Sequence, residues 1–199
     1  LEFRRVLFRS DTNINNDNIT SQTTNLTISG SGETNATVEL FDDANNDGVI
    51  DGGESLGTTT VAAGSFTLDV ALATDGVHHV KAIQTDVAGN VSSASTALDI
   101  TIDTVANAPT GLDLAAADDT NINNDNITSQ TSGLTISGSG ENGATVTLFD
   151  DANDDGVIDS GESLGTTTVT GGVFSLDVDL SGEGVHHVKA IQTDVAGNV

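Results

Sequence analysis

A long internal repeat constrains this chain more than any other feature. Residues 11–91 align with residues 119–199 at a constant offset of 108, and 66 of these 81 positions are identical. A period near 100 residues is the size of a whole domain and is too long for a solenoid unit. We therefore expect two like domains in tandem, at 11–104 and 105–199, with the second truncated at its C-terminal end. The segment 101–109 holds the single proline and joins the two copies.

The first ten residues, Leu1–Ser10, do not belong to the repeat. They contain three of the five basic residues of the chain, Arg4, Arg5 and Arg9. They lack the apolar centre and the small-residue cleavage site of a signal peptide. We interpret residues 1–10 as a non-native leader left by cloning or sequence assembly, and we expect them to lie outside the fold.

Within each copy, apolar and polar residues alternate over short runs. Phe66, Leu68 and Val70 are separated by Thr67 and Asp69, and the same pattern recurs near residues 26–28, 38–40, 58–61, 80–82 and 98–102. A further run at 112–115 begins the second copy. A period of two predicts half-buried strands, and glycine and asparagine separate the runs as turn residues do. No stretch has helical periodicity, so we predict an all-β chain of tandem seven-stranded immunoglobulin-like sandwiches.

The charge of the chain excludes several classes of partner. Thirty acidic residues against five basic ones give a net charge of −25. Phosphate backbones and anionic membranes would be repelled, so we expect no nucleic acid and no membrane docking. No apolar run approaches the ~20 residues of a membrane span, so we expect no membrane insertion. There is no cysteine to form a disulfide, and bound cations would relieve the repulsion and brace a modest core.

An acidic twelve-residue segment occurs once in each copy, at 43–54 and 151–162, between the predicted third and fourth strands. It matches the calcium-loop pattern D-x-[DN]-x-[DN]-G-x5-E, in which alternate positions supply oxygen ligands to a hard cation. Position 6 is glycine, where the loop turns sharply. Positions 1, 3, 5 and 12 would supply side-chain oxygens, position 7 a carbonyl, and position 9 a direct or water-mediated ligand. The predicted Ca²⁺ ligands are Asp43, Asn45, Asp47, Val49, Asp51 and Glu54 in the first copy and Asp151, Asn153, Asp155, Val157, Asp159 and Glu162 in the second. The alternative is a soluble, acidic turn without a metal.

Several segments of each copy resemble the bacterial immunoglobulin-like repeats of large secreted adhesins. These are Ile28–Glu33, Ala36–Phe41, Leu56–Thr60 and Gly76–Val80, together with Thr85–Asn90 (Thr-Asp-Val-Ala-Gly-Asn) and the linker Ile102–Thr104. The resemblance implies tandem spacer domains on a bacterial surface that are exported by type I secretion, rigidified by calcium and used in biofilm formation and cell adhesion. Their partners would be the neighbouring repeats of the same chain. The long acidic loop is a departure, since a shorter turn is common there.

The sandwich topology suggests a second metal site at the junction of the domains. Loops after the second, fourth and sixth strands would meet at the end where the chain enters each domain. For the second domain, these loops bring Glu141, Asp194 and Asn198 near Asp103 of the incoming linker. We hypothesise an inter-domain calcium site from these four residues, with Asn198 the weaker candidate. The alternative is that Asp194 and Asn198 only cap a tight turn.

Other constellations point away from catalysis. Adjacent strand residues face opposite sides of a sheet, so His78 and His79 cannot chelate one metal together. We predict that His78 is a partly buried, hydrogen-bonded residue. No nucleophile lies in a pattern with a base and no phosphate loop occurs, so we do not expect an enzyme. Two other functions stay open: a module that binds a carbohydrate or another ligand such as ice, and an accessory domain of a secreted hydrolase.

Overall fold

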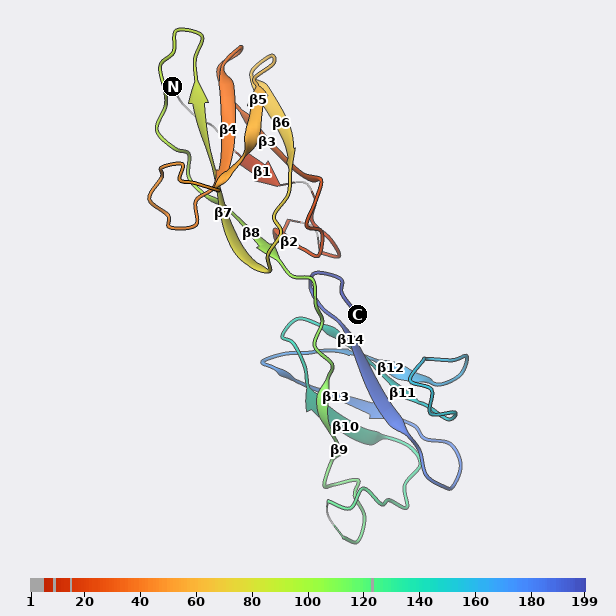
Figure 1. The fold of residues 1–199 in the computed structure, drawn as a ribbon. Helices are drawn as coiled ribbons and strands as arrows, with labels where there is room; N and C mark the ends of the chain where they lie inside the picture. Colours follow the sequence, from red (N-terminus) through yellow and green to blue (C-terminus); the bar gives the residue numbers. More distant parts are fainter. Residues whose placement is uncertain (1–5, 9, 15, 123) are drawn as a thin grey trace. The chain divides into compact units, whose positions relative to one another are not determined.

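The computed structural model describes residues 6–8, 10–14, 16–122 and 124–199 of the chain. They form two compact units, Leu1–Thr104 and Val105–Val199 (Figure 1). Every regular element in the described ranges is a β-strand, which confirms the all-β prediction. No helix among the described residues is long and apolar enough to cross a membrane.

The first unit consists of two sheets. One contains β1 (Val6–Phe8), β3 (Leu26–Ser31) and β6 (Ser65–Val70) in the order β1-β3-β6. The other has the order β2-β8-β7-β4-β5 and contains β2 (Ile19–Thr20), β4 (Thr37–Asp42), β5 (Ser55–Thr60), β7 (Gly76–Thr85) and β8 (Leu98–Ile102). All pairings are antiparallel except β2 with β8, which is parallel.

The core of the first unit lies between these sheets, because each strand turns one set of alternate residues inward. Leu26 and Ile28 of β3 pack in the same cluster as Val38 and Leu40 of β4, and all four are fully buried. The remaining buried members come from strands of both sheets and from residues next to them: Ala36, Val61, Phe66, Val70, Leu72, Val80, Ala82, Ile100 and Ile102. The two-sheet packing confirms the predicted immunoglobulin-like sandwich.

The second unit repeats this plan with fewer strands. One sheet has the order β13-β10-β9, from β9 (Thr110–Leu114), β10 (Leu134–Ser139) and β13 (Val173–Val178). The other has the order β12-β11-β14, from β11 (Thr145–Asp150), β12 (Ser163–Thr168) and β14 (Val188–Thr193). Its core contains Leu134, Ile136, Val146, Leu148 and Phe174 among its buried residues. Residues 127–128, which correspond to β2, form no strand, and the positions that would correspond to β8 lie beyond residue 199.

One expectation about the first ten residues needs correction. The sequence pattern predicts that Leu1–Ser10 lie outside the fold, but Val6–Phe8 form β1 and pair antiparallel with β3. Residues 1–5 and 9 of this predicted leader lie outside the described residues. An apolar, β-prone triplet can pair with the free edge of β3, whatever the charge of the residues around it. The first unit contains the two-residue β2 in addition to seven longer strands, and the described residues of the second unit, which the sequence predicts to be truncated, form six strands.

Candidate metal centre

The acidic segments are closed loops at the ends of two β-hairpins. In the first unit the loop leaves β4 after Asp42 and enters β5 at Ser55. The Asp42 N–H donates to the Glu54 carbonyl across 2.9 Å, which holds the two ends together. In the second unit the loop connects β11 to β12, the third and fourth strands, and Asp150 and Glu162 make the same 2.9 Å bond. The hairpins therefore fix where each loop begins and ends.

The backbone of each loop curls because three residues have positive φ. In the first loop Asn46, Gly48 and Gly53 have φ of 59°, 78° and 98°. Their counterparts Asp154, Gly156 and Gly161 have φ of 58°, 79° and 98°. Glycine adopts positive φ without strain, and asparagine and aspartate tolerate it better than other side chains. Left-handed residues at positions 4 and 6 turn the side chains at positions 1, 3 and 5 toward the inside of the loop.

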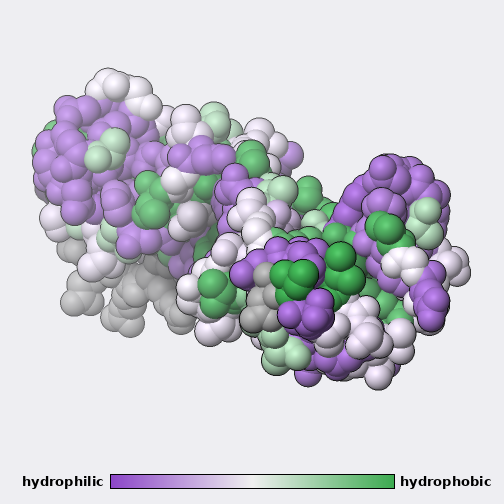
Figure 2. All heavy atoms as spheres, turned by 90° about the horizontal axis from the view of Figure 1, so that it is seen from below, coloured by the Kyte–Doolittle hydropathy of each residue, from purple (hydrophilic) through white to green (hydrophobic). Residues whose placement is uncertain are grey.

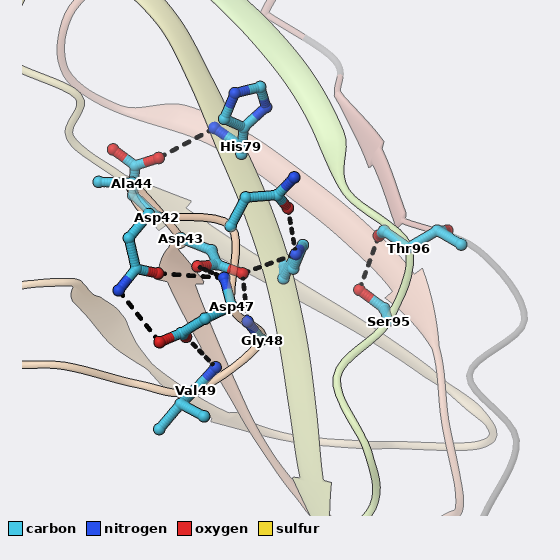
Figure 3. Close-up of polar contacts among 12 residues, drawn as sticks. Asp42, Asp43, Ala44, Asp47, Gly48, Val49, His79, Ser95 and Thr96 are labelled. Carbon is cyan, nitrogen blue, oxygen red and sulfur yellow. Dashed lines mark hydrogen bonds and ion pairs between the residues drawn. The ribbon is translucent and has the colours of Figure 1, made fainter.

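Inward carboxylates accept hydrogen bonds from the loop's own backbone (Figure 3). The Asp47 N–H donates to Asp43 Oδ1 at 3.0 Å, and the Gly48 N–H donates to Asp43 Oδ2 at 2.8 Å. The Val49 N–H donates to Asp47 Oδ1 at 2.8 Å. Glu54 reaches back across the loop and accepts from the N–H groups of Ala44 and Asp51. These bonds orient the acidic side chains at positions 1, 5 and 12.

The amide of Asn45 lies between two carboxylates. Its Nδ2 donates to Asp47 Oδ2 at 3.1 Å and to Asp51 Oδ2 at 3.0 Å. A partly positive N–H₂ group thus bridges the oxygens of positions 5 and 9. The Oδ1 atom of Asn45 accepts from the Asp47 N–H at 3.0 Å, so a cation beside the two carboxylates would need the side chain to turn and give up this bond. The residue types at positions 3, 5 and 9 all carry oxygen and fit Ca²⁺ by their chemistry.

A lysine from a distant strand contacts the first position of each loop. Lys81 of β7 donates from Nζ to Asp43 Oδ2 and to Asn46 Oδ1, both at 2.6 Å. Asp43 is fully buried and Lys81 is 9% exposed. Burial opposes ionisation of Asp43, but the Lys81 ammonium and the Gly48 N–H hold the pKa of this carboxyl below its ordinary value. The loop is therefore anchored to β7 by an ion pair and a hydrogen bond.

The second loop has the same bonds and one additional charge. Lys189 of β14 donates to Asp151 Oδ2 at 2.6 Å and also pairs with Asp154, which replaces Asn46. The Lys189 ammonium lowers the pKa of both carboxyls, and their two charges raise the pKa of Lys189. Asn153 bridges Asp155 and Asp159 as Asn45 does in the first loop.

The predicted side-chain ligands at positions 1, 3, 5, 9 and 12 are tied into each loop by hydrogen bonds to its backbone or to Asn45 and Asn153. Among the described residues, however, no three carboxylates of either loop have oxygens that all lie within 4.8 Å of one another. The side chains of Val49 and Val157, predicted to ligate through their carbonyls, are more than half exposed. For the hypothesised inter-domain site, the carboxylates of Glu141 and Asp194 in the second unit lie within 4.8 Å of each other. Asn198 donates from its amide to Asp194 at 2.7 Å. Asp103 belongs to the first unit, so the complete site stays a prediction.

Comparison with known proteins identifies the family. The model of the family described as "Bacterial Ig-like domain" matches residues 4–104 and again residues 106–199. The chain belongs to this family. The bacterial immunoglobulin-like resemblance inferred from the sequence is thereby confirmed. A search of curated proteins found no match.

Three solved structures are among those similar to these bacterial Ig-like repeats. A biofilm-associated protein BSP domain is 19% identical with a TM-score of 0.31, covering 88% of this chain and 26% of its own. Fibronectin(III)-like modules of Clostridium thermocellum CbhA are 16% identical with a TM-score of 0.39, and the match covers 98% of this chain and 88% of theirs. A chain from a 1.5-MDa bacterial ice-binding adhesin is 27% identical with a TM-score of 0.45, and the match covers 97% of this chain and 60% of that one. The chain therefore spans about a quarter of the first of these.

The incoming end of the second Ig-like repeat contains a buried amide that sequence reasoning missed. Gln192 is 3% exposed. Its Oε1 accepts from the Glu141 N–H at 3.1 Å, and its Nε2 donates to the carbonyl of Asn107. Asn107 in turn donates from its backbone N–H to the Glu141 carboxylate at 2.9 Å. Gln192 thus ties residue 107 to the loop after β10.

The first Ig-like repeat has only half of this arrangement. Gln84 accepts from the Glu33 N–H at 3.0 Å, as Gln192 does from Glu141. Its Nε2, however, is buried and makes no hydrogen bond within the described residues. A buried glutamine at the same place in both copies, Gln84 and Gln192, was the available sequence signal.

The histidine prediction is confirmed. His78 is 9% exposed, and its Nδ1 lies 2.6 Å from Asp42 Oδ2 while its Nε2 lies 2.9 Å from the Thr74 carbonyl. Burial opposes protonation, but these two acceptors raise the pKa of His78 above its ordinary value. His79 points elsewhere and its Nδ1 lies 2.7 Å from Asp99 on β8.

Proposed function

We propose that these bacterial Ig-like repeats are calcium-binding spacer domains of a cell-surface adhesin. The observation that supports calcium binding is the set of oxygen-bearing side chains that each loop turns inward, on a backbone curled by three residues with positive φ. The arrangement occurs twice, and hard cations with flexible coordination select oxygen-rich loops of this kind. The role is structural, because the repeated geometry lies in a hairpin and not in a reaction cleft.

Calcium would act on the repulsion within each loop. The first loop carries four carboxylates, Asp43, Asp47, Asp51 and Glu54, against the single ammonium of Lys81. A divalent ion beside Asp47 and Asp51 would replace the weak bridge made by the Asn45 amide. It would also hold the end of β4 and the start of β5 together. Because only the folded loop gathers these oxygens, binding adds to the stability of the folded repeat.

An extracellular location fits this mechanism. Extracellular calcium modules have dissociation constants of roughly 10⁻⁴ to 10⁻³ M, so their sites fill only where calcium is abundant. Tandem membership of a bacterial Ig-like family supports a role in which neighbouring repeats of one chain space a binding tip from the cell. Export by type I secretion and a part in biofilm formation belong to this proposal.

The proposal is tested by titrating calcium into the whole chain. Calorimetry should detect two loop sites, and at about ten times the dissociation constant each site should add ~1.4 kcal/mol of stability. For a repeat of this size that is a rise of about 7 °C in the unfolding midpoint. Magnesium at equal concentration should stabilise less, because it demands an octahedral site and dehydrates reluctantly.

Matched variants separate the loops from general charge effects. Glu54→Gln and Glu162→Gln together should abolish most of the calcium-dependent stabilisation. Asp113→Asn removes a carboxylate from β9, outside both loops, and should retain it. Equal loss of the calcium effect in both proteins, or no calcium effect in the wild type, would refute the proposed sites.

A further inference from the structure

An eight-residue segment is identical in the two repeats, at residues 11–18 and 119–126. It precedes β3 in the first unit and β10 in the second. The same three of its asparagines have positive φ in both units: 58°, 72° and 61° at Asn13, Asn16 and Asn18, and 75°, 68° and 55° at Asn121, Asn124 and Asn126. The segment therefore folds into one defined loop in each unit, which we call the asparagine loop.

The first residue of the asparagine loop is an aspartate that the backbone of the loop holds in place. In the second unit, Asp119 is 3% exposed. Its Oδ2 accepts from the N–H groups of Asn124, Asp125 and Asn126 at 2.5, 3.2 and 3.4 Å. Burial opposes ionisation of Asp119, but the N–H groups of Asn124 and Asn126 hold the pKa of this carboxyl below its ordinary value. The buried carboxylate is therefore charged at neutral pH.

The other oxygen of this aspartate is buried and makes no hydrogen bond within the described residues. This holds for Asp119 Oδ1 in the second unit and for Asp11 Oδ1 in the first. In the first unit, Asp11 Oδ2 again accepts from a loop N–H, that of Asn16 at 2.6 Å. A buried charged oxygen without a partner is costly, and native proteins contain few of them. Its recurrence in two separate units indicates a ligand that the described part of the chain does not supply.

A second carboxylate lies near Asp119. The Asp125 side chain is close enough to act on the Asp119 carboxyl. Its own Oδ1 accepts from the Ile127 N–H at 3.0 Å, and Asp17 is oriented in the same way by the Ile19 N–H at 3.0 Å in the first unit. Two carboxylates at short range repel each other unless a cation or a proton lies between them.

No lysine or arginine of the second unit is left to neutralise this pair. Lys189 is the only basic residue of these two types in residues 105–199, and it pairs with Asp151 and Asp154 of the hairpin loop at 151–162. The asparagine loop is open to solvent, because Ile122 and Ile127 are 60% and 66% exposed. Figure 2, which views the molecule from below, shows hydrophilic residues over much of the surface with hydrophobic ones between them. An ion from solution can therefore reach the loop.

We propose that each asparagine loop is a second calcium site, separate from the hairpin loops at 43–54 and 151–162. Asp119 and Asp125 are the anionic ligands in the second repeat, and Asp11 and Asp17 are their counterparts in the first. Asp119 binds the ion through Oδ1 and keeps the backbone hydrogen bonds of Oδ2. Amide and carbonyl oxygens of the loop and water complete the coordination. Calcium fits such a set because it accepts six to eight oxygens in irregular geometry, whereas magnesium demands an octahedron.

Hydrogen exchange of the whole chain tests these sites in a protein that carries Glu54→Gln and Glu162→Gln, so that the hairpin loops do not dominate the response. At about ten times the dissociation constant, calcium should slow exchange of the amides of 124–126 about tenfold, because these N–H groups open only when the ion leaves. The amides of 16–18 should slow in the same way. Adding Asp119→Asn should abolish the slowing at 124–126 and leave it at 16–18, so the first repeat is a control within the same molecule.

Two further variants separate the site from general effects of charge and folding. Asp118→Asn removes the neighbouring charge while its amide oxygen can still accept from the Thr135 N–H, as the Ser10 hydroxyl accepts from Thr27 in the first repeat. This variant should retain the slowing in both repeats. Asp125→Asn alters an exposed side chain and leaves the buried Asp119 in place. It should raise the calcium concentration needed for slowing at 124–126 about tenfold or more.

Sodium chloride at the same ionic strength should not slow exchange in either asparagine loop, and equal slowing would assign the effect to screening and overturn the proposal. Calcium without effect at 124–126 and 16–18 would also overturn it, and would leave a water molecule as the partner of Asp119 Oδ1. The hairpin-loop sites are tested separately, by exchange at 43–54 and 151–162 in the wild type. A response there alone would leave the proposed function standing without the second sites, and a response of the asparagine loops alone would do the reverse.

Discussion

Replacing Gly140 with alanine should loosen the incoming end of the second Ig-like repeat. A Cβ atom on Gly140 would lie 2.6 Å from Gln192 Oε1 and 2.9 Å from Val169 Cγ2. Both distances are too short for contact, so the Gln192 amide must move. The move would break the bond from the Glu141 N–H and the bond to the Asn107 carbonyl.

The expected cost follows from these two effects. Forcing an extra carbon into a packed site costs about 1–3 kcal/mol. Leaving a buried polar group without its partner costs a further ~1–3 kcal/mol. Partial relaxation of the glutamine brings the expected total to about 2–4 kcal/mol. For a domain of about 95 residues, each kcal/mol lowers the unfolding midpoint by about 5 °C, so the second repeat should melt about 10–20 °C lower.

Differential scanning calorimetry of the whole chain measures this shift, and hydrogen exchange of residues 105–110 locates it. Gly52→Ala is the control, because nothing lies within 4 Å of a Cβ at that position. It should leave both transitions almost unchanged. If the Gly140→Ala protein melts at the same temperature as the wild type or the control, the hydrogen bonds of the Gln192 amide do not contribute to the stability of the second repeat.

Three further predictions concern single side chains. Gln192→Leu should destabilise its repeat more than Gln84→Leu destabilises the first, because only Gln192 bonds to both Glu141 and Asn107; equal losses in urea titrations would contradict this. His78→Gln should lower the stability of the first repeat most at pH below about 6.5, where the imidazole is protonated and pairs with Asp42. The loss should become smaller as pH rises through the raised folded-state pKa of His78. A loss that is independent of pH in parallel melts would rule out the ion pair. Lys81→Met should destabilise the first repeat most without calcium, because buried Asp43 loses its cation. Added calcium should reduce this loss of stability. A loss that calcium does not change would show that Lys81 does not act through the charge of the loop.

Local patterns in the sequence were sufficient to predict most of the strands. The alternation of Phe66, Leu68 and Val70 predicts β6, because a period of two arises wherever one face of a strand is buried. The run near Leu112 predicts β9 in the same way. β1 was missed, since its triplet Val6–Phe8 lies among arginines and has no copy in the second repeat. Val6–Phe8 form a strand because they pair with β3, although the sequence around them does not predict one.

The polar contacts between distant residues could not be predicted from periodicity. Lys81 contacts Asp43 across 38 residues, and Gln192 contacts Asn107 across 85. Such pairs depend on which strands become neighbours and leave no regular spacing. A weaker signal was present, because Lys81 and Lys189 are the only lysines or arginines after Ser10 and occupy the same place in each copy. A lone cation in so acidic a chain points to a specific carboxylate partner.

Under the proposed function, the exchange of Asn46 for Asp154 should give the two repeats different affinities for a divalent ion. Lys189 divides its charge between Asp151 and Asp154, whereas Lys81 serves one carboxylate and one amide. The second loop consequently carries the greater uncompensated negative potential and should fill first at low ionic strength, while salt should narrow the gap. An array of such unequal units would respond gradually along a calcium gradient instead of switching at one threshold.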